Sequence, residues 1–386
     1  MDEALYLSYK AIAIFKNAAA EIAPLAEFLC ARDRVRRIEL CARIFGDVYA
    51  SGSSTTGEWI RKAVERDGNA FSRAAACGER IPDRIKAQIH AELLTFKRLS
   101  LVRPEDVCGD DADIAPKFVC GGFSLTYDKL VRFYAAESFG KFSHGSAFVY
   151  RNGALSPVFA EPIRLADLKN YAEEKAEIVK NTENFLNGLP AFHTLLYGDR
   201  GTGKSSTVRA IAYEFRDRLK TIELGKNDIR ELPALYAELR GLKQKFVLFV
   251  DDLGFDESDG GADELKAALE GSLASGAPNA ILYCTSNRRH LIKETDKSWA
   301  RSAEDERQAE LALFDRFGLV VTYLNPSRDE FIDILKQIMR SRGMKWRDEY
   351  AQIAELSALK KGGRSPRAAK QIADLIESTY VEKRGE

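Results

Sequence analysis

The 386-residue chain has few of the residues that build disulfide frameworks, zinc sites or membrane spans. Its four histidines and six cysteines show no CxxC pair and no Cys–His clustering, which argues against both a structural zinc site and a disulfide scaffold. Long apolar runs are missing too, because Lys10 and Lys16 interrupt the first apolar stretch. We therefore expect neither a signal peptide nor a membrane span, and predict a cytoplasmic protein. The cysteines are interpreted as reduced, mostly buried thiols: Cys30, Cys41, Cys77, Cys108, Cys120 and Cys284.

An excess of either charge is also absent. The 58 Lys and Arg residues balance the 58 Asp and Glu residues, so the whole molecule has no field that attracts nucleic acid or an acidic membrane. Two local basic runs, residues 32–37 and 360–367, are the only support for nucleic-acid binding. A solvated helix face is the simpler interpretation of the first, and phosphate binding, described below, accounts for the second.

The residue patterns divide the chain into four parts. Residues 1–110 show helical spacing and predict a helical N-terminal domain. Residues 111–161 carry β-branched and aromatic residues around glycines, with a hairpin signal at residues 151–153, and predict a small strand-containing connector. Residues 162–325 alternate strand and helix patterns, which is typical of an α/β domain. Residues 326–386 predict a separate bundle of helices.

The α/β part contains short, nearly continuous apolar runs. Such runs are typical of parallel strands that are covered on both faces, so they predict a doubly wound sheet. The expected strands are residues 193–199, 220–225, 245–252, 279–287 and 318–325.

A phosphate-binding loop follows the first of these strands. Residues 198–205, GDRGTGKS, match the pattern GxxxxGKS, and the required contexts of a strand before and a helix after are both present. The glycines let backbone N–H groups surround a β-phosphate, Lys204 places a cation against the phosphate oxygens, and Ser205 offers Mg²⁺ a hydroxyl ligand. The loop residues predicted to bind the nucleotide are Gly198, Asp199, Arg200, Gly201, Thr202, Gly203, Lys204, Ser205 and Ser206.

Polar side chains lie at the carboxyl ends of two later strands. Asp251 and Asp252 follow a buried strand, and the carboxyl ends of strands are where α/β folds place their ligands. Asp251 is the candidate that supports Mg²⁺, and Asp252 is the candidate general base for the attacking water. Asn287, at the end of the next predicted strand, is placed to orient that water.

Two arginines stand in later motifs. Arg316 lies in LFDRFG, before the fifth strand, and Arg367 lies in SPR, at the start of a helix. A guanidinium is always charged and binds phosphate oxygens as charge develops during transfer. Each arginine alone would be an ordinary surface residue, but the order of all the motifs favours a role in the nucleotide site.

This order of motifs resembles the AAA+ ATPases over residues 162–386. The stretches PIRLADLKNYAEEK, LLYGDRGTGKSS and TSNRRHL resemble more closely a family of uncharacterised bacterial ATPases with a domain of unknown function. The resemblance implies a five-stranded core in the order 5-1-4-3-2, a helical lid, ATP and Mg²⁺ as ligands, and a homo-oligomer such as a ring. It further implies that Asn287 is sensor 1, that Arg316 acts in trans on a neighbouring subunit, that Arg367 acts in cis, and that residues 168–171 lie by the adenine.

Two departures from the AAA+ pattern leave the function open between alternatives. Most relatives have Glu where Asp252 stands, and residues 224–235 lack the aromatic–Gly pore loop of threading unfoldases. An ATPase that remodels an unknown protein partner is the leading hypothesis, and a slowly hydrolysing loader or switch is the alternative. A GTPase is also conceivable because residues 251–254 spell DxxG, but no NKxD element for guanine follows.

Overall fold

The computed structural model describes residues 3–108, 116–143, 145–159, 162–254, 265–266, 269, 277–287, 314–360 and 363–380. It forms two compact units, each with its own core. The first comprises Met1–Gly145 together with Gly241–Gln244, and the second comprises Ser146–Arg240 together with Lys245–Glu386.

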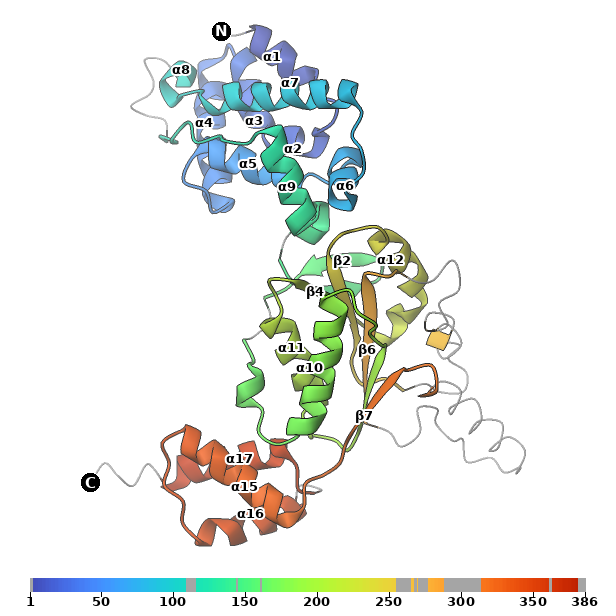
Figure 1. Cartoon of the computed structure of the whole chain (residues 1–386). Helices are drawn as coiled ribbons and strands as arrows, with labels where there is room; N and C mark the ends of the chain where they lie inside the picture. The colour runs from blue at the N-terminus through green and yellow to red at the C-terminus, as the bar shows by residue number, and fades with distance from the viewer. Residues whose placement is uncertain are drawn as a thin grey trace. The chain divides into compact units, whose positions relative to one another are not determined.

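All the regular secondary structure in the described residues of the first unit is helical (Figure 1). It extends past the predicted helical domain, because α9 belongs to it as well. Its helices and 3₁₀ turns are α1 (Glu3–Lys10), α2 (Lys16–Glu21), α3 (Ala23–Glu27), η1 (Phe28–Cys30), α4 (Arg34–Ala50), α5 (Thr56–Arg66), α6 (Ala70–Cys77), α7 (Asp83–Ser100), α8 (Pro104–Cys108), α9 (Tyr127–Glu137) and η3 (Gly140–Ser143).

The basic run at residues 32–37 is the start of α4. The side chain of Asp33 caps this helix by accepting a hydrogen bond from the Arg36 backbone N–H at 2.8 Å. The Arg36 guanidinium pairs with Glu27 at 2.9 Å and with Glu39 at 3.2 Å. Local capping and ion pairing therefore account for Asp33 and Arg36 without a nucleic-acid partner.

A buried carboxylate fixes the connection between α1 and α2. Glu92 of α7 is only 2% exposed, and its two oxygens accept hydrogen bonds from the backbone N–H groups of Ala13, Ile14 and Phe15. These donors precede α2, and the N–H of Phe15 is buried, so the carboxylate satisfies a backbone group that would otherwise be buried without a partner.

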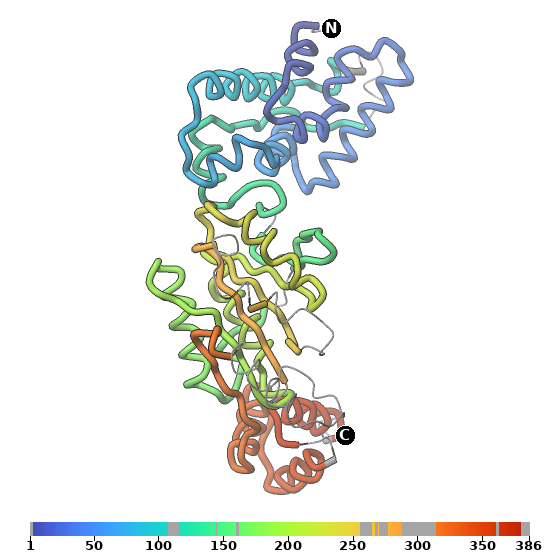
Figure 2. Tube along the Cα trace, turned by 90° about the vertical axis from the view of Figure 1, so that its right-hand side faces the viewer, coloured from blue at the N-terminus to red at the C-terminus, as the bar shows by residue number. Residues whose placement is uncertain are grey.

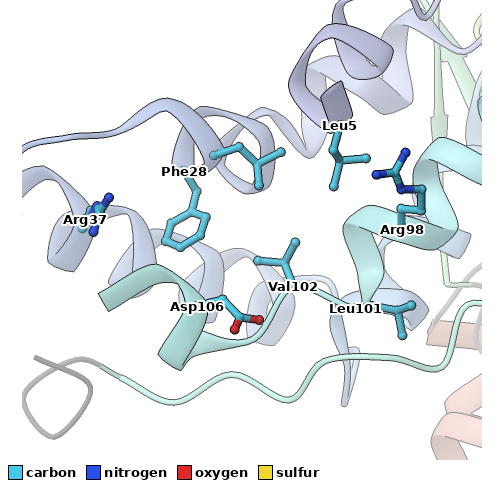
Figure 3. A pocket seen from close by; sticks show the side chains of 8 residues that line it. Leu5, Phe28, Arg37, Arg98, Leu101, Val102 and Asp106 are labelled. Atoms are coloured by element: carbon cyan, nitrogen blue, oxygen red, sulfur yellow. The ribbon is translucent and has the colours of Figure 1, made fainter. Parts of the chain in front are cut away.

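The helical unit also contains a cavity of about 390 Å³ (Figure 3). Leu5, Phe28 and Val102 form its apolar lining, and Arg37 and Arg98 flank it. The lining carboxylate of Asp106 accepts hydrogen bonds from Arg103, whose guanidinium lowers the pKa of that carboxyl.

The second unit is built on a seven-stranded sheet in the order β2-β1-β4-β5-β6-β3-β7 (Figure 1). All neighbouring strands are parallel except β1 and β2, which form an antiparallel hairpin. The strands are β1 (Ala147–Arg151), β2 (Ala154–Pro157), β3 (Thr194–Gly198), β4 (Leu219–Leu224), β5 (Lys245–Val250), β6 (Ala280–Ser286) and β7 (Leu319–Tyr323).

The predicted α/β class with a parallel sheet is confirmed, but the sheet is wider than expected. The five predicted strands appear as β7-β3-β6-β5-β4, which is the relative order 5-1-4-3-2. The hairpin predicted at residues 151–153 is present, with Asn152 and Gly153 at φ +50° and +79°, as a two-residue turn requires. However, its strands do not form a separate connector, because β1 pairs with β4 and extends the same sheet.

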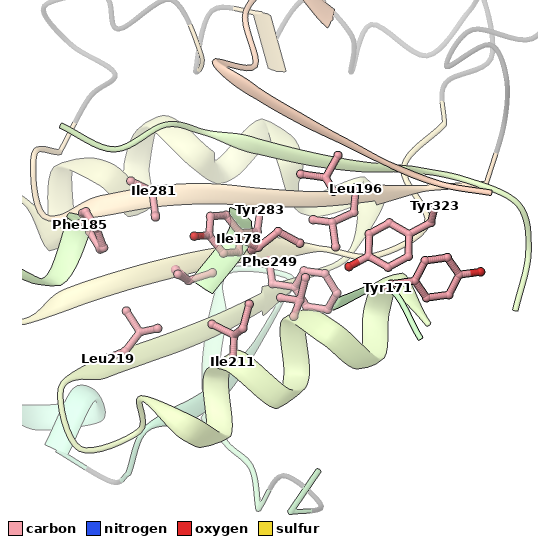
Figure 4. Close-up of a cluster of buried hydrophobic side chains, with 13 residues drawn as sticks. Tyr171, Ile178, Phe185, Leu196, Ile211, Leu219, Phe249, Ile281, Tyr283 and Tyr323 are labelled. Atoms are coloured by element: carbon pink, nitrogen blue, oxygen red, sulfur yellow. The ribbon is translucent and has the colours of Figure 1, made fainter. Parts of the chain in front are cut away.

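Helices cover both faces of this sheet. The helices α10 (Ala172–Leu186) and α11 (Lys204–Glu214) pack on one face through Ile178, Phe185, Val208 and Ile211 (Figure 4). The intervening residues of β5, such as Phe246 and Leu248, point to the opposite face of the sheet and are buried too. Figure 1 shows α12 (Leu232–Leu239) on that face. Burial on both faces explains the nearly continuous apolar runs of the strands.

Three helices follow the sheet in the second unit, coloured orange to red in Figure 2. They are α15 (Arg328–Ser341), α16 (Glu349–Lys360) and α17 (Pro366–Tyr380), and they share a core that includes Phe331, Leu335 and Ile372. Among the described helices, none has both the length and the apolar composition that crossing a bilayer requires.

A neutral histidine links three strands of the sheet. The Nδ1 atom of His193 accepts a hydrogen bond from the Leu282 N–H at 2.9 Å, and the His193 carbonyl accepts one from Leu319. Burial lowers the pKa of His193 from 6.5 to about 4. Since protonation of Nδ1 would break the first bond, the folded protein favours the neutral imidazole.

This histidine makes stability depend on pH. The unfolded chain binds the proton more tightly, so the contribution of His193 is complete above pH 6.5 and is lost as the pH falls toward 4. We predict that the free energy of unfolding drops by up to about 3 kcal/mol more in the wild type than in His193→Asn between pH 7 and pH 4. The asparagine oxygen can accept the same hydrogen bond without titrating. Equal pH profiles for the two proteins in urea unfolding would contradict this expectation.

Candidate phosphate-binding site

The predicted phosphate loop connects the end of β3 to the start of α11. Gly198 has φ +129°, and a Cβ atom there would lie 2.1 Å from the carbonyl oxygen of Tyr323 on β7, so only glycine fits. Gly203, at φ +100°, is the N-cap residue of α11 and places no side chain over the helix start. The first backbone N–H groups of α11 therefore have no side-chain cap and can bind an anion.

Lys204 is folded against the loop that precedes it. Its ammonium donates hydrogen bonds to the carbonyl oxygens of Gly198 at 2.9 Å and Asp199 at 2.6 Å. Thr202 holds the same turn, since its hydroxyl donates to the Asp199 carbonyl at 2.8 Å. The lysine is only 4% exposed, and burial lowers its pKa from 10.5 to about 8. A desolvated ammonium gains more than an exposed one from a phosphate oxygen brought beside it.

Asp251 lies directly after β5, at the carboxyl end of the sheet. One of its oxygens, Oδ1, accepts hydrogen bonds from the hydroxyl of Ser205 at 2.5 Å and from the hydroxyl of Thr285 at 2.6 Å. Its other oxygen, Oδ2, lies 3.3 Å from the guanidinium of Arg209. The structure thus brings the predicted metal residues Ser205 and Asp251 into direct contact.

The neighbouring carboxylate, Asp252, points to a different partner. Its backbone is left-handed, with φ +54°, and its N–H donates to the Thr285 hydroxyl at 2.9 Å. The amide of Asn287 donates to the Asp252 carboxylate at 2.8 Å. The predicted base candidate and the predicted sensor residue are therefore paired, and Thr285 holds the backbone turn that presents Asp252.

The helical lid, formed by α15, α16 and α17, contacts the phosphate loop through the start of α17. The backbone N–H of Arg367 donates to the Gly201 carbonyl at 3.2 Å, and a Cβ at Gly201 would lie 2.9 Å from the Ser365 hydroxyl. The Asp199 carboxylate accepts the Asn325 N–H at 2.8 Å. Gly201 and Asp199 of the loop are thus held by chain segments after β7, while Arg200 lies exposed and Ser206 lies on the first turn of α11.

The segment predicted beside the adenine is tied to the same region. Tyr171 has φ +56°, donates its hydroxyl to the Leu324 carbonyl at 2.7 Å, and packs its ring 4.9 Å from that of Tyr323 (Figure 4). The preceding turn η4 (Leu165–Asp167) lies against α11. Lys175 donates to the Leu168 carbonyl at 2.5 Å.

Arg316 lies exposed in the turn before β7. The other arginine of the lid motif, Arg364, pairs with Glu355 at 2.7 Å inside the lid, which raises its pKa.

Two residues of the site were not singled out from the sequence. Thr285 precedes Asn287 by two positions, so the two-residue period of a strand puts both side chains on one face. Arg209 follows Ser205 by four positions, so helical spacing puts both on one side of α11. The sequence contains both spacings. They indicate a site only when the structure shows that Thr285 and Arg209 both contact Asp251.

The donor set fits a magnesium nucleotide. Among the described residues, no three His, Cys, Asp or Glu side chains gather into a cluster that would hold a metal by themselves. Ser205 and Asp251 instead offer one hydroxyl and one carboxylate, which suits Mg²⁺, a cation that keeps several waters and binds substrate phosphates.

A family model matches residues 143–380, which is most of the second unit. The chain belongs to the DUF815 family, whose description is "Protein of unknown function". This match confirms the predicted membership of a family with a domain of unknown function. The relative strand order 5-1-4-3-2 is the one that the resemblance to AAA+ ATPases implies.

Curated and solved proteins are similar over part of the chain. The replication factor C large subunit of Staphylothermus marinus is 26% identical over 211 residues, covering 52% of this chain and 44% of that protein. The chain therefore spans less than half the length of this curated relative. The Thermotoga maritima RuvB Holliday junction branch migration motor is 17% identical with a TM-score of 0.40, covering 59% of this chain and 68% of RuvB. The FIGL-1 AAA domain in complex with ADP is 17% identical with a TM-score of 0.40, covering 59% and 77%.

The role of Thr285 gives a stability prediction. Its hydroxyl is buried, donates to Asp251 and accepts from Asp252, so Thr285→Val removes both bonds while conserving shape. We predict a loss of about 1–3 kcal/mol in the free energy of unfolding, measured in urea, with Thr285→Ser close to the wild type. A valine variant as stable as the serine variant would show that the hydroxyl contributes nothing.

Proposed function

We propose that this protein binds ATP with Mg²⁺, hydrolyses it, and couples the nucleotide state to assembly of a homo-oligomer and remodelling of a protein partner in the cytoplasm. The main support is the contact of Ser205 with Asp251 beside the buried ammonium of Lys204. Phosphoryl transfer needs a phosphate cradle, a cation and a metal support in one place, and these residues supply all three.

The chain's own groups take distinct roles in this proposal. The uncapped N–H groups of α11 and the Lys204 ammonium bind the phosphate oxygens. Ser205 and Asp251 hold Mg²⁺, which when bound neutralises charge on the phosphate oxygens. Asp252 accepts the proton of the attacking water, and its Asn287 partner orients that water. Arg367, at the start of α17, contacts phosphate from the lid of the same subunit.

Replacing Lys204 tests whether the phosphate loop binds ATP. Lys204→Ala should weaken ATP binding by about tenfold to a hundredfold, because it removes a charged hydrogen-bond donor to phosphate. The wild-type affinity should also fall as the pH rises through about 8, where Lys204 loses its charge. Calorimetric titration with ATP and Mg²⁺ measures both effects.

The matched control is Lys180→Ala, which removes an exposed lysine of α10. It should bind ATP like the wild type. Undiminished ATP affinity in Lys204→Ala would contradict the proposed phosphate site.

The proposed homo-oligomer depends on the role of Arg316. This arginine is exposed before β7, and its motif LFDRFG resembles the AAA+ arginine-finger box, which acts on the nucleotide of a neighbouring subunit. Arg316→Ala should lower the ATPase rate by about a thousandfold, and the wild-type specific rate should rise with protein concentration.

Mixing two inactive variants tests action in trans. A subunit with Lys204→Ala keeps Arg316 and can complete the site of an Arg316→Ala neighbour, so the mixture should recover part of the activity. If the mixture stays as inactive as its components while both variants still assemble, Arg316 does not act across an interface.

A slow switch is the second candidate function. Asp252 has one methylene less than Glu, and its carboxylate is already engaged by Asn287, which favours infrequent hydrolysis. In this case ATP binding alone would drive assembly. Fast multiple-turnover hydrolysis by the wild type without any partner, seen in the same rate assay, would rule the switch out.

A further inference from the structure

A row of alternating charges leads from Asp251 to the hairpin at the edge of the sheet. The Arg209 guanidinium lies 3.3 Å from Asp251 and 3.6 Å from Glu223 of β4. Arg151, the last residue of β1, lies 3.6 Å from the other oxygen of Glu223 and 4.0 Å from Asp228. We call Asp251, Arg209, Glu223, Arg151 and Asp228 the charge row.

The far end of the row is anchored to backbone. Asp228, in η5 (Lys226–Glu231), is buried, and its carboxylate accepts the N–H of Asn152 at 2.9 Å and that of Gly225 at 3.2 Å. Asn152 is the first residue of the hairpin turn. The row therefore runs through side chains from Asp251 to Asp228, which binds the backbone of the turn between β1 and β2.

Arg209 is the shared member of the row. It follows Ser205 by one helical turn, and both face the carboxyl ends of β4 and β5, which are neighbours in the sheet. Glu223 pairs in register with Phe249, so Asp251, two residues further on, points to the same face. One guanidinium thus lies between two carboxylates that compete for it.

We propose that Arg209 is a positioning residue that competes with the divalent cation for Asp251, and that Glu223 receives its guanidinium when the cation binds. This inference rests on the proposed function, because it takes Asp251 as a support for Mg²⁺. A cation beside Asp251 repels the guanidinium, which then pairs more closely with Glu223. Glu223 then attracts Arg151 less strongly. Binding of the cation therefore weakens the ion pair between Glu223 and Arg151, the residue before the β1–β2 turn.

Exposure limits the size of the effect. The side chains of Arg209 and Arg151 are 47% and 48% exposed, and those of Glu223 and Asp251 are both 30% exposed. Pairs with this much solvent contact are worth up to about 1 kcal/mol, which corresponds to about a fivefold change in an equilibrium constant. The competition is therefore a modest adjustment of cation affinity rather than an on–off switch.

The test measures how much Mg²⁺ is needed for binding of a fluorescent, non-hydrolysable ATP analogue. Arg209→Gln should lower the half-saturating Mg²⁺ concentration by about two- to fivefold, because the competitor is gone. Glu223→Gln should raise it by a similar factor, because Arg209 then loses the carboxylate that competes with Asp251 for its guanidinium. Neither readout depends on hydrolysis.

A double variant separates the proposed competition from simple attraction between Mg²⁺ and any nearby carboxylate. If Glu223 acts through Arg209, adding Glu223→Gln to Arg209→Gln leaves the Mg²⁺ requirement unchanged. If Glu223 attracts the cation directly, the two effects add, and the inference is overturned. Matched controls are Arg216→Gln and Glu214→Gln, which remove exposed charges at the end of α11 and should change nothing.

The outcome also distinguishes this inference from the proposed function. A wild type that does not bind the analogue with Mg²⁺ refutes both. A wild type that binds with a Mg²⁺ requirement equal to that of Arg209→Gln refutes the inference alone. Thermal unfolding without nucleotide checks that each variant is folded, and Arg209→Met is a second variant that removes the charge while keeping the aliphatic stem.

Discussion

The site depends on one carboxylate oxygen shared by two hydroxyl groups. Oδ1 of Asp251 accepts from Ser205, on the helix after β3, and from Thr285, on β6. These bonds tie the start of α11, the helix that follows the phosphate loop, to the ends of two adjacent strands. They add to the packing of α11 on the sheet and to the bond from the Asp252 N–H to Thr285, so that Ser205, Asp251 and Asp252 are held together.

The sheet supplies the geometry that this interaction needs. In the order β4-β5-β6-β3-β7, the strands that carry Asp251, Thr285 and the phosphate loop are direct neighbours. Their carboxyl ends share one edge, where an open α/β sheet binds ligands. Gly198 allows β7 to approach the loop closely, and the start of α17 contacts Gly201. The phosphate loop and the start of α17 are thus joined by a main-chain hydrogen bond, from the Arg367 N–H to the Gly201 carbonyl.

Much of the fold could be predicted because its signals are local. Apolar runs indicated β3 to β7, and the loop residues 198–205 follow from spacing alone. The edge hairpin was predicted as a turn, but its place in the sheet was not, since the pairing of β1 with β4 joins segments 74 positions apart, as for Ala147 and Thr221. In the site, Asp251 and Ser205 were predicted, whereas Thr285 and Arg209 were missed. Their roles arise from side chains that meet across the sheet, which a pattern along the chain does not encode.

The role proposed for Ser205 and Asp251 is to support the metal of a bound nucleotide. A crystal structure of the protein grown with Mn²⁺ and a non-hydrolysable ATP analogue tests it most directly, because manganese gives anomalous scattering that marks its own position. We expect one anomalous peak within coordination distance of the Ser205 hydroxyl, next to Asp251, with the phosphates at the start of α11. A peak elsewhere, or an analogue bound away from this loop, would contradict the account.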